Sequence, residues 1–196
     1  MKKQTKYIAN RLCLLLGICL LAVAAAALIS WLLCVQSSKQ TNISLVNTIR
    51  TLIPTPTSIA LEERRDNTMS VFSIDGTNFA GILEIPKYGS ELPVCADWGN
   101  VSKYPCRLDG NIYDRTMQIG GTSQKGQYDF YRDISIGDSV LFTDMEGNRF
   151  SYEVTGIRYE KHADQDALQR ENAALTLFIK NIYAFEYIII FCNVLH

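Results

Sequence analysis

The stretch Ala174-Leu-Thr-Leu-Phe-Ile-Lys-Asn181, followed by Ile182 to Phe185 and the apolar run Glu186 to Val194, decides the fold of this chain. Both outer segments are rich in β-branched, aromatic and other apolar residues, and the connection between them is short. This pattern predicts a strand, a loop and a second strand. The remaining strands of the β-sheet to which these two belong must come from the preceding residues.

Short strands separated by turn signals continue this pattern through the preceding residues. Gly120-Gly121 stops one strand, and Asp144-Met-Glu-Gly147 connects the two strands of a hairpin. The predicted strands are residues 80–85, 91–94, 116–119, 139–143, 149–159, 175–179 and 187–194. A short helix is expected at Asp164 to Asn172. The sequence therefore predicts an all-β domain, a small closed β-barrel of about eight strands with short helices.

An apolar N-terminal segment precedes this domain. Leu12 to Val35 carries no charge, and as a helix it is long enough to cross a hydrocarbon core about 30 Å thick. Four basic residues precede it, whereas Lys39 is the only nearby charge after it. The positive-inside rule then places residues 1–11 in the cytoplasm and the C-terminal domain outside. We therefore predict a single-pass cell-membrane protein with a transmembrane anchor at 12–35, an extracytoplasmic spacer at 36–78 and the barrel at 79–196.

A cleavable signal peptide is the alternative for this segment, because Ala22 to Ala27 offers small residues. Secretory apolar regions usually span about 7–15 residues, whereas this one continues through Trp31 and Leu33. A retained anchor is therefore favoured. Within the spacer, Thr41 to Ile53 has the apolar spacing of a short helix, and Pro54 ends it.

The charge balance argues against a nucleic-acid partner. The chain has 19 basic and 20 acidic residues and no concentrated basic face to neutralise phosphates. Neither a metal-ligand spacing nor a cofactor motif occurs in the sequence. Cys95 and Cys106 bracket the polar loop 96–105 and can pair as a disulfide in an exported domain, which leaves Cys192 unpaired. The odd number of cysteines in this domain leaves the pairing open.

In their order and spacing, these segments resemble the sortases, the membrane-anchored cysteine transpeptidases of Gram-positive bacteria. The resemblance covers residues 79–194 and is nearer the class B or D branches than class A. The matching segments are Phe79-Ala-Gly-Ile-Leu-Glu-Ile-Pro86, Leu92-Pro-Val94, Tyr104-Pro-Cys-Arg107, Ile136-Gly-Asp138, Val140-Leu-Phe-Thr-Asp-Met-Glu-Gly-Asn148, Tyr152-Glu-Val154 and Ala174-Leu-Thr-Leu-Phe178. They imply a sortase-type β-barrel behind one N-terminal transmembrane helix.

Sortase chemistry needs a cysteine thiolate that attacks a backbone carbonyl, a histidine that moves the proton and an arginine that stabilises the oxyanion. The resemblance places the histidine directly after Gly120-Gly121, where this chain has Thr122. It places the cysteine at the end of the next-to-last strand, at Lys180, and the arginine at Tyr187 or, with a shift of one, Glu186. None of the three groups is present, so the resemblance implies a degenerate site.

Other residues can take over the chemistry only in a relocated site. The candidates are Cys192, Cys106, His162 and, as an amine nucleophile, Lys180. Each also has a plainer interpretation. Cys192 alternates with apolar residues and is expected to be a buried structural thiol, and Cys106 a structural or disulfide-bonded one. His162 lies in a polar loop and is expected to be solvated, and Lys180 is expected to pair with a carboxylate at the barrel mouth.

Three functional hypotheses follow from these observations. In the favoured one, a non-catalytic sortase-like membrane protein binds a sorting-signal peptide, a cell-wall precursor or another envelope protein in its groove. In the second, an active transpeptidase with a relocated nucleophile attaches proteins to the cell wall or to pilins. That hypothesis requires Cys106 or Cys192 within hydrogen-bond reach of His162. In the third, the chain is a decayed paralogue, against which its unbroken strand pattern argues.

Overall fold

The computed structural model describes residues 2–54, 68–162 and 172–195, with the backbone alone at 2–14 and 33–39. It divides into two compact units, Met1–Lys39 and Gln40–His196. The first unit is the N-terminal part of helix α1 (Lys2–Leu52). Its segment Leu15–Leu32 has a mean hydropathy of 2.5 and is long and apolar enough to cross a membrane. The predicted apolar N-terminal helix is thus confirmed.

Helix α1 is longer than the sequence predicts. The polar residues 36–40 were expected to separate the anchor from a short helix at Thr41 to Ile53, but α1 runs without interruption to Leu52. Neither glycine nor proline occurs between residues 36 and 52, so no residue there breaks the backbone hydrogen bonds. Pro54 follows the end of the helix, as expected.

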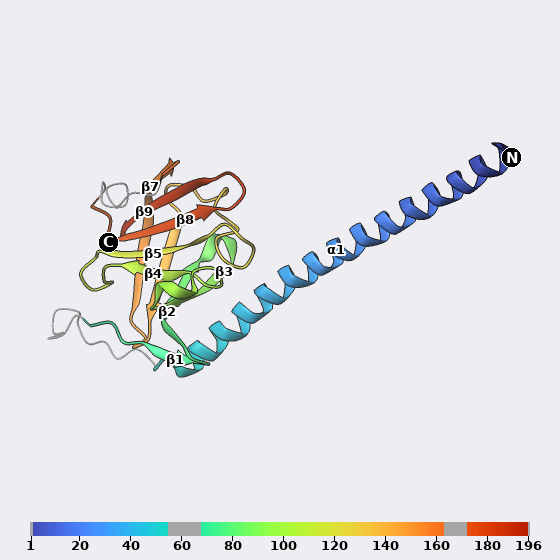
Figure 1. Ribbon diagram of the computed structural model, residues 1–196. Coiled ribbons are helices and arrows are strands. Elements are labelled where there is room, and N and C mark those ends of the chain that lie inside the picture. Colours follow the sequence, from blue (N-terminus) through green and yellow to red (C-terminus); the bar gives the residue numbers. More distant parts are fainter. Residues whose placement is uncertain (1, 55–67, 163–171, 196) are drawn as a thin grey trace. The chain divides into compact units, whose positions relative to one another are not determined.

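The second unit contains a closed β-barrel (Figure 1). Nine strands form one sheet in the order β1-β2-β3-β4-β5-β8-β9-β7-β6, and β2 also pairs with β6, so that eight strands close on themselves. The strands are β1 (Phe72–Ile74), β2 (Thr77–Ile85), β3 (Ser90–Cys95), β4 (Cys106–Asp109), β5 (Met117–Thr122), β6 (Ser139–Asp144), β7 (Arg149–Glu160), β8 (Leu175–Asn181) and β9 (Glu186–Val194). Two short 3-10 helices, η2 (Pro86–Tyr88) and η3 (Trp98–Asn100), accompany them. This confirms the predicted fold class.

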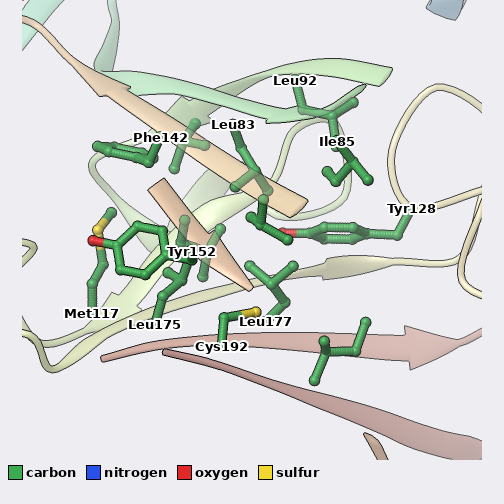
Figure 2. Close-up of a cluster of buried hydrophobic side chains, with 14 of the residues drawn as sticks. Leu83, Ile85, Leu92, Met117, Tyr128, Phe142, Tyr152, Leu175, Leu177 and Cys192 are labelled. Atoms are coloured by element: carbon green, nitrogen blue, oxygen red, sulfur yellow. The ribbon is translucent and has the colours of Figure 1, made fainter. Parts of the chain in front are cut away.

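Alternating side chains fill the interior of the barrel, because successive residues of a strand point to opposite faces. Figure 2 shows this core, in which Leu83, Met117, Tyr152 and Leu177 come from four different strands. All four are fully buried or nearly so. The core therefore fixes which residues of each strand face outward.

Two of the observed strands, β1 and β4, were not predicted from the sequence. β1 lies within the predicted spacer and forms a hairpin with β2 through Asp75 and Gly76, whose φ angles are 48° and 75°. An Asp-Gly pair with both φ angles positive is the usual two-residue hairpin turn. β4 has only four residues and was also not predicted.

The predicted stop at Gly120-Gly121 is wrong, because β5 continues through both glycines to Thr122. A glycine inside a strand often marks a close approach by another group rather than the end of the strand. The helix expected at Asp164 to Asn172 lies outside the described residues except for Asn172, which is not helical.

Candidate functional site

Two rows of paired residues cross the barrel wall where β5, β8, β9 and β7 are neighbours. In the first row, Thr122 pairs with Lys180, Lys180 with Tyr187, and Tyr187 with Glu160. The second row is offset by two residues on each of these four strands and continues onto β4 and β3. Its residues are Cys95, Cys106, Gly120, Phe178, Ile189 and Arg158. The first row brings the three predicted family positions side by side.

Both rows lie on the outside of the barrel. Leu177 and Ile179 of β8 belong to the interior core. Phe178, between them, packs instead in a separate cluster with Ile189 and Tyr187. Because side chains alternate along a strand and directly paired residues share a face, Lys180 also points outward. The candidate site is therefore an outer face of the barrel.

Aromatic side chains form the floor of this face. The Tyr187 ring stacks on Phe178, with ring centroids 5.1 Å apart and an interplanar angle of 14°. Trp98 of η3 lies over Gly120: a Cβ atom at residue 120 would be 2.4 Å from an indole carbon. The Trp98 side chain nevertheless remains 40% exposed. We call Trp98, Phe178 and Tyr187 the aromatic platform.

A buried glutamine joins the end of β5 to the loop 96–105, which carries Trp98. The Gln127 side-chain oxygen accepts a hydrogen bond from the Thr122 backbone N–H at 2.9 Å, and its Nε2 donates to the Val101 carbonyl at 3.2 Å. Gln124 Nε2 donates to the Ser102 carbonyl at 2.7 Å. These three bonds, of which the two of Gln127 are partly buried, hold the loop against the wall.

The turn between β8 and β9 forms one rim of the face. Asn181 is buried; its Oδ1 accepts from the Tyr183 backbone N–H at 3.0 Å, and its Nδ2 donates to Glu186 at 2.9 Å. These bonds hold Tyr183 and Phe185 out toward solvent, and Phe185 is 92% exposed. Phe185 has φ of 50°, in the left-handed region that a residue with a side chain seldom adopts.

The first row offers little acid–base or nucleophilic chemistry. The Thr122 hydroxyl is buried and has no hydrogen-bond partner among the described residues. Lys180 is exposed, and its predicted pairing with a carboxylate does not occur within the part of the chain that the structure describes. The alternative arginine position, Glu186, accepts the Asn181 hydrogen bond. Thiol, imidazole and guanidinium are thus absent from the first row itself.

The relocated site of the second hypothesis is not assembled in this structure. Cys192 lies inside the barrel (Figure 2), and burial raises the pKa of its thiol. Its partner on β7 is Val154, whereas His162 is exposed and follows the other end of that strand. The part of β7 between Val154 and Glu160 alone spans about 20 Å.

Cys106 is also separated from His162 in the barrel. It is fully buried on the outer wall in the second row, and its thiol donates to the Tyr104 carbonyl at 3.4 Å. Three strands, β5, β8 and β9, lie between its strand and β7. Neither candidate thiol therefore meets the histidine.

Sequence reasoning missed the residues that shape the face, Trp98 and Gln127. Gly120-Gly121 was the available signal, because two glycines inside a strand leave room for other side chains: Trp98 over Gly120, and Gln127 and Tyr128 beside Gly121. No local pattern marks Gln127. A separate open cavity of about 430 Å³ lies at the opposite ends of β5 and β8 and contains none of the predicted site residues; its lining is Asp114, Arg115, Thr116, Asn172, Ala174, Asn193 and Val194.

The sequence matches no protein-family model and no curated protein. The structure, by contrast, is similar to solved sortases. Sortase C of Clostridium perfringens, in a structure with the C-terminal cell wall sorting motif, shares 14% identity over 79% of this chain and 87% of that one, with a TM-score of 0.52. Sortase A of Corynebacterium diphtheriae shares 17% identity over 83% of this chain and 82% of that one, with a TM-score of 0.50. Sortase C1 of Streptococcus suis shares 16% identity over 60% of this chain and 73% of that one, also with a TM-score of 0.50.

The barrel topology and these similarities define the class of structure: this chain has the sortase fold. At such low identity the similarity concerns the fold alone. These neighbours are named sortase A or sortase C, so the assignment to class B or D stays a prediction.

Proposed function

We propose that this chain is a membrane-anchored protein of the Gram-positive cell envelope that keeps the sortase fold without sortase catalysis and binds an extended peptide on its outer face. The observation that carries the proposal is the first row. The strand register that would bring a sortase's histidine, cysteine and arginine together brings together Thr122, Lys180 and Tyr187. Their side chains cannot form a thioester, move a proton near neutral pH or act as a guanidinium clamp.

The face nevertheless has features of a binding surface. The aromatic platform presents a partly exposed indole and a stacked pair of rings, and aromatic groups contribute strongly to peptide contacts. Gln127 donates to the Val101 carbonyl and Asn181 accepts from the Tyr183 backbone N–H, and these bonds hold both sides of the face in place, which lowers the entropy lost on binding. A peptide with a cell wall sorting motif is the first ligand to test, since that motif accompanies the similar Clostridium perfringens sortase C.

The localisation proposal rests on the N-terminal segment. Leu15–Leu32 can span a membrane, and Lys2, Lys3, Lys6 and Arg11 precede it. The positive-inside rule supports a cytoplasmic N-terminus and an extracytoplasmic barrel. In that position the outer face meets sorting-signal peptides, cell-wall precursors and other envelope proteins.

A binding experiment tests the proposal directly. The full chain in detergent micelles is titrated into a fluorescein-labelled peptide that carries a cell wall sorting motif, and polarisation is measured. We expect saturable binding with a peptide that mass spectrometry finds intact after prolonged incubation. Tyr187→Ala should weaken binding about five- to tenfold, because it removes one aromatic contact from the platform.

Tyr159→Ala is the matched control. Tyr159 is likewise a tyrosine near the end of its strand and is exposed, whereas Tyr187 is half-buried. Its partner Ile188 faces the core, so Tyr159 lies on the other face of the sheet. This variant should bind the peptide as the unchanged chain does. Absence of saturable binding, or an equal loss in both variants, contradicts the proposal, and cleavage of the peptide supports the active-transpeptidase hypothesis instead.

A further inference from the structure

Two cysteines face each other at the base of the loop that carries Trp98. Cys95 is the last residue of β3 and Cys106 the first of β4, and they are the single register pair that joins these two parallel strands. Both side chains are fully buried in the same small cluster outside the barrel. Paired residues of neighbouring strands point to the same side, so the two thiols meet.

The distance between the strands suits a disulfide. Neighbouring strands lie about 4.7–4.9 Å apart, within the range of about 4.4–6.8 Å that disulfides span between Cα atoms. In this structure both cysteines are free thiols. The interaction between the two neighbouring thiols lowers the pKa of Cys106 and raises the pKa of Cys95. Cys106 is therefore the thiol that ionises first and attacks an oxidant.

The residues between the two cysteines connect this pair to the candidate site. Loop 96–105 begins and ends at the pair, and in between it places Trp98 over Gly120. Hydrogen bonds from Gln124 and Gln127 to its carbonyls also attach it, and residues 96 and 97 are hydrogen-bonded to Asn78. A covalent bond between the two ends of the loop would keep β3 and β4 together, so the loop could no longer open by their separation.

We propose that Cys95 and Cys106 form an intramolecular disulfide that fastens the Trp98 loop over the outer face. The Cys106 thiolate attacks a sulfur of a small disulfide such as oxidised glutathione and expels one thiolate, which leaves a mixed disulfide on Cys106. Cys95 then loses its proton and attacks the Cys106 sulfur, which releases the second glutathione thiolate. Two protein thiols are oxidised, one disulfide is reduced to two thiols, and the two protons pass to the released thiolates.

The third cysteine of the domain serves as an internal control. Cys192 lies in the barrel interior, among core residues such as Leu175 and Tyr152, whereas Cys95 and Cys106 belong to the cluster outside the wall. The β-sheet therefore separates Cys192 from the pair. The pairing is independent of the proposed peptide binding, since it depends on the strand register alone.

The chemistry is tested on the full chain in detergent micelles, with oxidised glutathione as the oxidant. We expect intact mass to fall by two hydrogens, and peptide mapping without reductant to find Cys95 linked to Cys106. Cys192→Ala should leave this result unchanged, whereas Cys95→Ala and Cys106→Ala should each abolish it. If a variant fails to fold, peptide mapping of the unchanged chain alone shows whether Cys95 and Cys106 are linked. No linkage, even when the oxidant is present during refolding, or a linkage through Cys192 overturns the proposal.

The fastening of the loop is tested by fluorescence. The chain has two tryptophans, so Trp31→Phe leaves Trp98 as the only tryptophan, whose emission is excited apart from that of the tyrosines. We expect acrylamide quenching of Trp98 to fall about twofold on oxidation, because the closed loop opens less often. Equal quenching before and after oxidation overturns the fastening, whether or not the disulfide forms.

Discussion

At the scale of single residues, Gly120 sets how closely loop 96–105 approaches the barrel wall. A Cβ atom there would lie 2.4 and 2.5 Å from two indole carbons of Trp98, a distance that real contacts do not tolerate. Gly120→Ala should therefore push the indole away and lower the free energy of unfolding by about 1–3 kcal/mol, as overpacking does elsewhere. Urea unfolding followed by circular dichroism measures this.

Gly99→Ala is the control for that substitution, because no atom lies within 4 Å of a Cβ atom at residue 99 and its φ is not positive. It should change the free energy of unfolding little, within about 0.5 kcal/mol. Combining Gly120→Ala with Trp98→Ala should cost less than the sum of the two single changes, since the clash is then gone. Strict additivity would show that Trp98 does not rest on Gly120.

At the scale of elements, the parallel pairing of β5 with β8 sets the chemistry of the outer face, because it makes Thr122 and Lys180 direct neighbours. Lys180→Cys should place a solvent-accessible thiol at this position with an ordinary pKa of about 8.5. Adding Thr122→His should lower that thiol pKa to about 7.5 or below, since an adjacent imidazolium stabilises the thiolate. The pH dependence of alkylation, mapped by mass spectrometry, reports the shift.

Thr122→Asn with Lys180→Cys is the matched control, because an amide does not carry a charge at any of these pH values. Its thiol should titrate like that of Lys180→Cys alone. The native Cys95, Cys106 and Cys192 are buried and should react slowly. If the histidine and asparagine variants titrate alike, Thr122 and Lys180 do not face one another and the assignment of the family positions fails.

The elements also show what a single sequence can predict. β2, β6, β7, β8 and β9 follow the alternation and turn signals closely, and their predicted positions lie within or near the observed strands. β1 and β4 have three and four residues, too few to show a periodic pattern. The Asp75-Gly76 turn was the one local signal of β1.

The candidate site was predictable only through the family resemblance. Thr122, Lys180 and Tyr187 lie 58 and 7 residues apart in sequence, and only the strand register makes them neighbours. Trp98 and Gln127 depend on contacts between loops and strands that no local pattern encodes. Register and loop packing are tertiary properties, so the sequence alone shows the strands and not the surface that they build.

At the scale of the whole molecule, the proposed function requires the barrel to lie outside the cell. Helix α1 contains Leu15–Leu32, which is long and apolar enough to span a membrane, and we propose a cytoplasmic N-terminus from the basic residues before it. Tyr183→Cys places a thiol on the exposed turn between β8 and β9, where the tyrosine side chain is 62% exposed. In intact cells of a Gram-positive host, a membrane-impermeant maleimide should label this variant within minutes.

Gln4→Cys is the control for that labelling, since it lies before the apolar stretch and should react only after the membrane is permeabilised. The unchanged chain should give the background, because Cys95, Cys106 and Cys192 are buried and Cys13, Cys19 and Cys34 lie within the predicted anchor 12–35. Labelling of Gln4→Cys rather than Tyr183→Cys in intact cells would place the barrel in the cytoplasm. The outer face could then meet no extracytoplasmic peptide, and the disulfide between Cys95 and Cys106 would lose the oxidising surroundings that favour it.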